Sequence, residues 1–521
     1  MAEAAVSRTT TARSGGEPAR GGRRVLLPLG LAAFITALDS SVTSVAAPTI
    51  QRDLDLSLSS LEWIAACYLL AFGGLMLLGG RLTDMLGRRR VLQLGLWLFC
   101  VSSIGVAVAP GPALILTGRT LQGVAAALIV PAAFALVAVD MGYEDRHLGA
   151  AVFTGAVGGA IALGPVVGGS IAEYLHWSFI FWINVPVVVV ASWAVARAVP
   201  KQEPARYGVR EWLSRLDGYG LLFSTMTLCG ITFALVEGGN LGYRSVPVLA
   251  ACALVAVGVL GTVVAERRAA YPMLDLPLVR HRLVAGSLLC QLLWGLGING
   301  VVFFTSLFLQ NVVGLPPTAA GLVFVPLAVT VAAVVPFSGK LSQRYGTHRV
   351  VALGMVLMAG GLMLVGTVGH GDPVWRLLPA VVVMGVGSAF TVPMVAAPMD
   401  VVPVSRAGVV SALLSVSREM AGVLGIALTG AVVVARQNAV VDGGATELAG
   451  FLSGYRAGLM LGAAVSLVGA VVAWFTLFPG QAMLPDPATP SEPIDVDPIQ
   501  DIIIDLTDTG GFPVLTGGRQ P

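Results

Sequence analysis

The chain has 521 residues, of which 56% are apolar and only 12% are charged, and its mean hydropathy is +0.84. A soluble globular protein carries about 25% charged residues, so a chain of this composition cannot turn its whole surface to water. The net charge of +2 excludes the strong basic bias of a nucleic-acid-binding protein. The composition therefore predicts an integral membrane protein that binds no nucleic acid.

The N-terminal segment, residues 1–24, is rich in Arg, Ser, Thr, Ala and Gly and predicts a disordered tail. The first apolar run after it continues to the length of a full membrane span, whereas a cleavable signal peptide has a shorter apolar core. We therefore expect this run to remain in the protein as its first helix.

Fourteen apolar stretches of about 20 residues follow one another between charged or Pro/Gly breaks, each long enough to cross a bilayer as a helix. Backbone amides in lipid must be satisfied internally, and these stretches are too long for barrel strands, so an all-α integral membrane fold is expected. The expected spans are residues 25–48, 60–79, 91–110, 113–136, 148–169, 178–198, 217–236, 246–265, 283–311, 319–338, 349–368, 376–398, 408–434 and 457–478.

The distribution of basic residues predicts the orientation of these spans. With the N-terminus inside, 24 of the 31 Lys and Arg residues fall on the cytoplasmic side and five fall in the outer loops. Cytoplasmic loops carry the excess of basic residues in membrane proteins, so both termini are expected in the cytoplasm. Residues 480–521, rich in Pro, Asp and Gly, predict a disordered cytoplasmic tail.

Cysteine and histidine usage predicts no metal site, cofactor or disulfide. The five cysteines are odd in number and lie in apolar runs without a CxxC pair, and the five histidines are scattered without ligand-like spacing. We also find no nucleotide-binding GxxxxGK[ST] loop and no catalytic constellation. The chain is therefore not expected to be an enzyme, and an ion gradient is the expected source of energy for any transport.

The loop after the second expected span is repeated after the tenth. Residues 80–91 read GRLTDMLGRRRV, residues 339–350 read GKLSQRYGTHRV, and the two align without a gap. Their offset is eight spans, whereas a plain duplication of a six-helix bundle would give six. We therefore expect a six-helix bundle at 25–199, an inserted helix pair at 217–265 and a second six-helix bundle at 283–478.

Four motifs in four spans resemble the major facilitator superfamily, and specifically its 14-helix drug:proton antiporter branch. The resemblance covers nearly all of residues 25–478. Ser44 departs from that branch, which usually has Asn at this position. The matching stretches are LDSSVTSVAAP at 38–48, motif A at 80–90 with Gly80, Asp84, Gly87 and Arg88, motif B as RTLQG at 119–123, and motif C as GPVVGG at 164–169 with Gly164, Pro165, Gly168 and Gly169.

The resemblance implies a major facilitator fold of two six-helix bundles plus two inserted helices, in the cell membrane. It implies a proton-coupled antiporter that exports small organic molecules such as drugs or antibiotics by alternating access. The implied partners are a small-molecule substrate, protons and membrane lipid, with the monomer as the working unit. Two alternatives remain open: an exporter or importer of an endogenous metabolite on the same scaffold, and a membrane sensor that does not transport.

Asp39 is the most informative residue, because an acid deep in an apolar span is costly and is by default a functional candidate. It lies about 12 Å from the outer boundary of its span, and Arg119 lies about 9 Å from the outer start of the fourth. Thr36, Asp39 and Thr43 form a polar stripe at helical spacing. We expect Asp39 and Arg119 to serve proton coupling; a static ion pair is the alternative.

Motif A places Asp84 and several arginines in a short cytoplasmic turn, where Gly80 and Gly87 permit close backbone approach. Asp84 can accept from a neighbouring helix N-terminus or from the adjacent arginines, which suggests a conformational latch. Fixing the topology is the simpler role of these arginines. In motif C the small residues predict close helix packing, with Gly155 and Gly159 as a further small pair on the same span.

Two further spans carry candidate residues. In the thirteenth, Glu419 is a possible second proton site or cation contact, unless Arg418 neutralises it, beside a face of polar and small residues at helical spacing. In the ninth and fourth, polar and aromatic side chains predict a substrate cavity, which Phe303 and Phe304 would either line or simply pack against. The candidate cavity residues are Gln122, Gln291, Trp294 and Asn299.

Overall fold

The computed structural model describes residues 22–141, 145–202, 217–268, 276–369 and 372–478. Fourteen helical segments in this part of the chain are long and apolar enough to cross a membrane. The all-α class and the fourteen expected spans are thereby confirmed. The expected tails lie outside the described residues, except that Gly22–Val25 forms a 3₁₀ turn (η1) that leads into the first helix.

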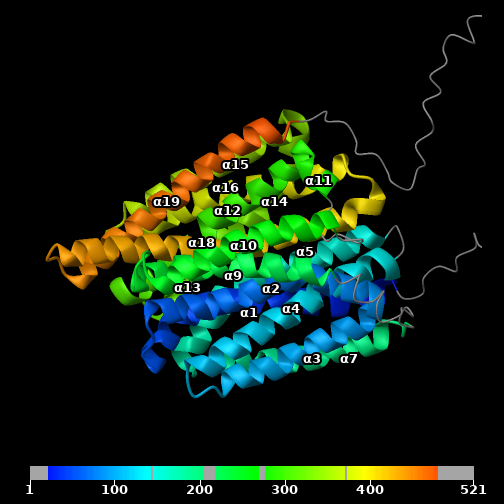
Figure 1. The fold of residues 1–521 in the computed structure, drawn as a ribbon, viewed down its shortest axis with the longest axis horizontal. Coiled ribbons are helices and arrows are strands. Elements are labelled where there is room, and N and C mark those ends of the chain that lie inside the picture. The colour runs from blue at the N-terminus through cyan, green and yellow to red at the C-terminus, as the bar shows by residue number, and fades with distance from the viewer. Residues whose placement is uncertain (1–21, 142–144, 203–216, 269–275, 370–371, 479–521) are drawn as a thin grey trace, which may run out of the picture.

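The first six spans form the N-terminal half of the molecule, drawn in blue and cyan in Figure 1. The helices α2 and α4 approach closely because Gly79 and Gly123 lie at their contact: a Cβ on Gly79 would stand 1.9 Å from the Ala127 oxygen. The elements of this half are α1 (Leu26–Leu54), α2 (Leu58–Leu86), α3 (Arg88–Ala107), α4 (Pro112–Asp140), α5 (Arg146–Tyr174), α6 (Phe179–Trp182) and α7 (Asn184–Ala198).

The last six spans form the C-terminal half, yellow-green to orange in Figure 1. At 39 residues α18 measures about 58 Å, well beyond the thickness of a bilayer core, so it extends past the expected 408–434 at both ends. The elements are α11 (Leu276–Arg280), α12 (Arg282–Leu307), η3 (Phe308–Val312, a π turn), α13 (Pro317–Leu322), α14 (Val325–Tyr345), α15 (Thr347–Gly366), η4 (Val374–Arg376), α16 (Leu377–Thr391), α17 (Pro393–Ala396), η5 (Ala397–Asp400), α18 (Val404–Asp442) and α19 (Glu447–Thr476).

The inserted pair, α9 (Gly218–Leu241) and α10 (Val246–Arg268), lies beside the junction of the two halves, in green in Figure 1. Helix α9 packs against α2 of the first half, against α18 of the second and against α10. Helix α10 is exposed along most of its length. The pair therefore contacts both halves through one of its two helices.

The sequence repeat corresponds to a structural repeat. Gly87 ends α2 with φ 88° and ψ 136°, and Gly346 ends α14 with φ 90° and ψ 141°. This left-handed region strains any residue with a side chain, which explains why glycine stands at the same place in both loops. The two halves thus turn from their second to their third helix with the same backbone geometry.

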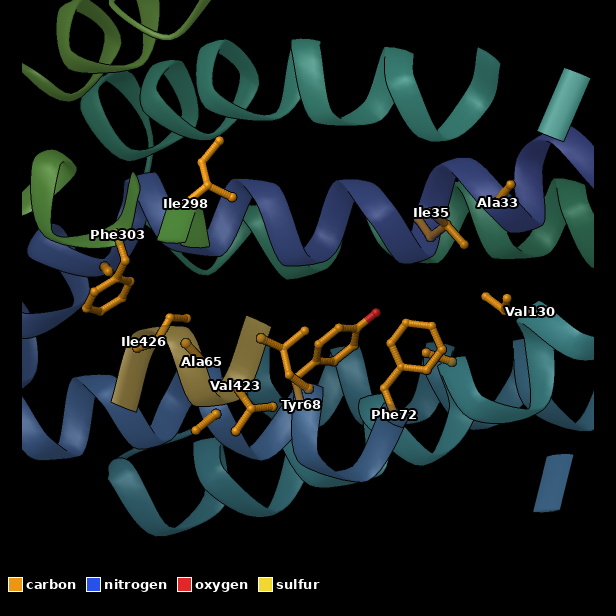
Figure 2. Close-up of a cluster of buried hydrophobic side chains, with 14 of the residues drawn as sticks. Ala33, Ile35, Ala65, Tyr68, Phe72, Val130, Ile298, Phe303, Val423 and Ile426 are labelled. Atoms are coloured by element: carbon orange, nitrogen blue, oxygen red, sulfur yellow. The ribbon is translucent and has the colours of Figure 1, made fainter. Parts of the chain in front are cut away.

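An apolar cluster joins the two halves. Figure 2 shows Tyr68 and Phe72 of α2 in the same cluster as Val423 and Ile426 of α18.

The closest contacts between the halves lie toward the end of the bundle where α1 ends and α2 begins, which we call the α1–α2 end. There the Gln310 amide donates to the Val45 oxygen of α1 at 2.9 Å. Near the opposite end of α5, a Cβ on Gly155, Gly158 or Gly159 would meet nothing within 4 Å.

Candidate functional site

The two charged residues expected at matching depth form a buried ion pair. Asp39 on α1 and Arg119 on α4 are each only 1% exposed, and the Arg119 Nη1 donates to the Asp39 Oδ2. Burying such a pair is favourable only when further hydrogen bonds satisfy both groups. The remaining contacts of the pair therefore decide whether Asp39 is stabilised as a carboxylate.

Three polar side chains complete the site around Asp39. The Asp39 Oδ1 accepts from the Gln122 amide at 3.1 Å and from the Asn184 amide at 2.9 Å. Both amides also donate to the Ser103 hydroxyl, at 2.8 Å from Gln122 and 3.2 Å from Asn184. The Asp39 carboxylate is thus held by groups from α3, α4 and α7 as well as by Arg119, so four helices of the N-terminal half meet at one acid.

Helix α2 supplies the other side of the Arg119 guanidinium. The Arg119 Nε donates to the Ile64 oxygen at 3.2 Å. The guanidinium carbon of Arg119 stands 4.5 Å from the centre of the Tyr68 ring, which is a cation–π contact. The Tyr68 hydroxyl, which points toward α1 in Figure 2, donates to the Thr36 oxygen at 2.9 Å. Tyr68 is fully buried and separates the ion pair from the C-terminal half.

Of the three residues in the expected polar stripe of α1, Asp39 is the one whose side chain reaches other helices. The hydroxyls of Thr36 and Thr43 donate to backbone oxygens within α1, at 3.1 Å to Ala33 and 2.7 Å to Asp39. Their hydrogen bonds are therefore satisfied by their own helix. Asp39 is the member of the stripe whose side chain bonds to other helices.

A second charged pair lies on α18 of the C-terminal half. The Arg418 Nη2 donates to the Glu419 Oε1 at 2.8 Å, so the neutralising contact considered from the sequence is formed. The Arg418 side chain is 41% exposed, whereas Glu419 is buried against Gly73 of α2. Tyr68 of α2 interacts electrostatically with both ion pairs. One charged pair from each half thus lies close enough to act on the same aromatic side chain.

The expected cavity residues do not come together. Gln122 is fully buried in the Asp39 site. Gln291, Trp294 and Asn299 lie on α12 instead, where the Asn299 amide is occupied by the Gly295 oxygen and the buried Trp294 Nε1 has no hydrogen-bond partner among the described residues. Phe303 and Phe304 are buried against each other, so they pack rather than line a cavity.

An apolar pocket lies elsewhere in the described part of the chain. It has a volume of about 570 Å³, lies between α2, α4, α9 and α10 and is lined by side chains such as Trp63, Cys67, Cys229 and Phe233. Its lining comes from the inserted pair and the N-terminal half, not from α12. The expected grouping of Gln122 with the α12 residues is therefore wrong for this conformation, because Gln122 is turned toward Asp39.

Motif A makes contacts within the N-terminal half and, through Arg81, with Asp217 and Glu266 of the inserted pair, with which Arg81 interacts electrostatically. The Arg88 guanidinium pairs with both carboxylate oxygens of Asp140 at the end of α4, and Arg89 donates to the Val199 oxygen after α7 at 2.7 Å. Asp84 is exposed, and within the described ranges no hydrogen bond or ion pair holds it. Arg88 and Arg89 turn to the end of α4 and to the chain after α7, so neither bonds to Asp84 here, whereas Arg81 of α2 interacts with Asp84 electrostatically.

The two motif A glycines differ in their roles. Gly87 has a positive φ, and a Cβ there would come within 2.9 Å of the Gln202 side chain. At Gly80 the nearest atom would be 3.9 Å away, an ordinary contact, whereas at the neighbouring Gly79 it would be 1.9 Å away. The expected close backbone approach is thus found in this part of α2, but at Gly79 rather than at Gly80.

Motif C packs α5 against both halves. Gly164 and Gly168 face α1, where added Cβ atoms would stand 2.0 Å from the Ser41 hydroxyl and 2.8 Å from Val42. A Cβ on Gly169 would stand 2.4 Å from the Pro317 oxygen of α13 in the other half, and a Cβ on Gly321 of α13 would stand 2.2 Å from the Pro165 oxygen. The expected close packing is confirmed for these residues, but not for Gly155 and Gly159, whose faces are open.

The sequence interpretation missed several polar residues of these sites. Ser103 and Asn184 bond to the Asp39 site but lie singly in apolar spans, so no pattern marks them. Glu62 and Glu237 are acids within the second and seventh spans. The cost of an acid in a span, which singled out Asp39, would have pointed to them as well.

In the described part of the chain, fourteen apolar helices form two repeated halves of six spans and an inserted pair, and each half buries charged side chains. These features define a multi-pass helical membrane transporter. The chain matches the family model of the Major Facilitator Superfamily over residues 29–426, and again over residues 288–507. It therefore belongs to the major facilitator superfamily, in the branch of the antibiotic resistance and multidrug efflux proteins.

Individual relatives agree with this placement. The chain is 31% identical to the puromycin resistance protein pur8 of Streptomyces alboniger over 85% of this chain and 89% of that protein. It is 31% identical to the multidrug efflux pump LfrA of Mycolicibacterium smegmatis (81% and 83%) and 27% identical to the tetracenomycin C resistance and export protein of Streptomyces glaucescens (79% and 76%). Among solved structures, the POT family transporter PepTSo shares the fold with a TM-score of 0.63 at 15% identity, covering 87% of this chain and 97% of that one.

Proposed function

We propose that this protein is a proton-coupled antiporter that exports small organic molecules such as drugs or antibiotics across the cytoplasmic membrane. The observation that carries the proposal is the Asp39 site, where a buried acid, its cationic partner and three polar side chains join four helices. The relatives named for resistance and efflux support the direction and class of substrate. Membrane lipid surrounds the protein, and the monomer is the working unit.

The coupling proceeds through competition for Asp39. When Asp39 is ionised, Arg119 and the amides of Gln122 and Asn184 hold it between α1, α4 and α7. Protonation removes the charge that attracts Arg119, and the freed guanidinium then finds its best partners in a different packing of these helices. Substrate and proton thereby favour different conformations, which is the linkage that antiport requires.

From the charge distribution we infer that both termini lie in the cytoplasm, so that the α1–α2 end of the bundle is the outer end. The halves contact each other closely at that end through α1 with η3 and α5 with α13. This conformation is accordingly the one closed to the outside and accessible from the cytoplasm. Motif C, at the α5–α13 contact, helps to seal the outer side. Asp84, which no hydrogen bond holds within the described ranges, engages as a latch in the opposite conformation.

Substrate enters between the halves, near Gln291, Trp294 and Asn299 of α12 and the Arg418–Glu419 pair of α18. Trp294 offers an aromatic ring and an unpaired N–H, and Glu419 offers a carboxylate for a cationic compound. A lipophilic cation suits this combination of groups. Glu419 is the second candidate for a proton site.

Efflux by cells that lack their own pumps tests this function. Cells that express the chain should accumulate less of several lipophilic cations, antibiotics and dyes than cells that express the Asp39→Asn variant at the same membrane level. The asparagine keeps the size of the side chain and most of its hydrogen bonds but cannot exchange a proton. Equal accumulation of every compound by both cells would refute drug export and would favour an endogenous metabolite as substrate.

A further inference from the structure

A second pair of acids lies inside the bundle, away from Asp39. Glu62 is on α2, four residues and about 6 Å from the start of the helix, and Glu237 is on α9, four residues before its end. Glu62 is only 2% exposed. Both acids therefore lie near the α1–α2 end, where the inserted pair meets the two halves.

The Glu62 carboxyl lacks the partners that an ionised acid needs. Its Oε1 is buried and has no hydrogen-bond partner among the described residues, whereas the Glu237 Oε1 accepts from the Trp63 indole at 2.8 Å. A buried carboxylate without a cation or hydrogen bonds is very costly, so Glu62 is neutral in this conformation.

The groups that face Glu62 do not supply a cation. Glu237 of α9 is the charged group with an appreciable electrostatic effect on Glu62 among the described residues, and it is another acid. The turn after α9 presents the Tyr243 phenol, while Arg244 beside it is exposed. The nearby cation of α18, Arg436, is also exposed and donates to Ser453 of α19.

The carboxyl of Glu62 fits against a glycine of the other half. A Cβ on Gly430 of α18 would stand 2.3 Å from the Glu62 Oε1 and 2.7 Å from its Oε2. No side chain can occupy that space while the carboxyl is there. Glu62 therefore touches the C-terminal half directly, and its burial depends on the contact between α2 and α18.

We propose that Glu62 is a second proton-binding site, whose proton is held between α2 and α18 while the α1–α2 end is closed. When the halves separate there, water reaches the carboxyl and the O–H proton passes to it, leaving a carboxylate. To close again, the carboxylate takes a proton from hydronium on the same side. Since this proton enters and leaves on one side, it controls closure and is not the transported proton, which the proposed function assigns to Asp39.

The distance between two spin labels at this end tests the inference. The labels are placed on cysteines introduced at Arg52 in the last turn of α1 and at Ala445 before α19, both exposed, in a chain whose five native cysteines are replaced. Wild-type protein in lipid nanodiscs should move from the short to the long distance as the buffer is changed from acidic to alkaline. Glu62→Gln, which cannot ionise, should keep the short distance throughout, and Glu447→Gln, a matched change of an exposed acid at the same end, should behave like the wild type.

The glycine contact supplies a second, independent test. Gly430→Ala places a methyl group where the carboxyl lies, so the long distance should prevail even in acidic buffer. The double variant Glu62→Ala with Gly430→Ala frees that space and should recover the short distance. A double variant that stays at the long distance would contradict the contact.

The outcomes for this site and for the proposed function are separable. If Glu62→Gln keeps the pH dependence of the wild type, the Glu62 site is refuted, whatever Asp39→Asn does to transport. If no proton-coupled transport is found but the label distance still depends on Glu62, antiport fails while the Glu62 proton site stands.

Discussion

Asp39 and Arg119 are two buried charged side chains of the N-terminal half, and they form an ion pair. Each group relies on the other, because their further hydrogen bonds come from neutral amides and a backbone oxygen. Removing one partner of a buried pair leaves an uncompensated charge, whereas removing both leaves none. The pair is therefore strongly coupled in stability, whatever its role in transport.

This coupling predicts the outcome of a double-mutant cycle. Arg119→Gln should destabilise the protein by about 3–5 kcal/mol, because the Asp39 carboxylate is left without its cation. Asp39→Asn with Arg119→Gln should recover part of that loss, since neither charge remains. Thermal unfolding in detergent measures both, and a strictly additive cycle would show that the two side chains do not interact.

The sequence could predict the Asp39–Arg119 pair but not the rest of its site. Both charges are expensive in lipid, and helix rise alone places them at similar depth. Gln122 follows Arg119 by three residues, so helical spacing puts both on one face and could have assigned it to the same site. Ser103 and Asn184 could not be found in this way, because small polar residues are tolerated anywhere in a membrane helix.

At the scale of helices, small residues determine which faces meet. Gly164 and Gly168 of α5 contact α1, while Gly155 on the same helix faces open space. The sequence pattern of motif C predicts close packing but cannot distinguish these faces, because a glycine that packs and one that does not look alike. The same limit explains why Gly79, rather than Gly80, makes the close contact of α2 with α4.

Alanine substitutions at two positions of α5 should therefore differ. In Gly168→Ala the new Cβ would lie 2.8 Å from Val42 on α1, so we expect a loss of stability. Overpacking of this kind costs about 1–3 kcal/mol. Gly155→Ala meets nothing within 4 Å and should leave the unfolding temperature unchanged. Equal effects on unfolding in detergent would contradict the observed packing of α5 on α1.

The contacts of motif A predict that Arg88 contributes to stability and that Asp84 contributes to transport. Arg88 and Asp140 pair with each other between α3 and α4, so Arg88→Gln, Asp140→Asn and the double variant should lower the unfolding temperature to the same extent. Asp84→Asn should change it little, because no hydrogen bond holds Asp84 within the described ranges and its electrostatic interaction with Arg81 is made at an exposed position. We expect it to reduce transport nonetheless, and to do so more than Gln343→Ala. A large stability loss in Asp84→Asn would refute a latch that acts in the opposite conformation alone.

For the whole molecule, the repeat predicted the order of the spans, while the orientation expected from the basic residues stays a prediction. The offset of eight spans indicated an inserted pair, and α9 and α10 follow α7 of the first half and precede α11 of the second. What the sequence could not predict is that α9 contacts both α2 and α18, because helix pairing depends on side-chain packing rather than on span order. The conformational state also lies beyond the sequence, since a transporter must adopt more than one.

Reporter fusions test the proposed orientation of the molecule. A reporter fused after Lys201, which follows six spans, should lie in the cytoplasm, and one fused after Asp372, which follows eleven, should lie outside. A periplasmic-active and a cytoplasmic-active reporter at each site provide matched controls. The same location at both sites would overturn the orientation, and with it the assignment of the α1–α2 end to the outer side.

Proton movement in proteoliposomes tests antiport through Asp39 most directly. A pH-sensitive dye is trapped inside vesicles of the purified full-length protein, and a transported lipophilic cation is supplied on one side without any imposed pH gradient. Substrate flowing down its gradient should drive protons in the opposite direction, so the dye should report a pH change. With Asp39→Asn, substrate should still exchange but the dye signal should disappear. Substrate-driven proton movement at the wild-type rate in Asp39→Asn would contradict the central role of this carboxylate.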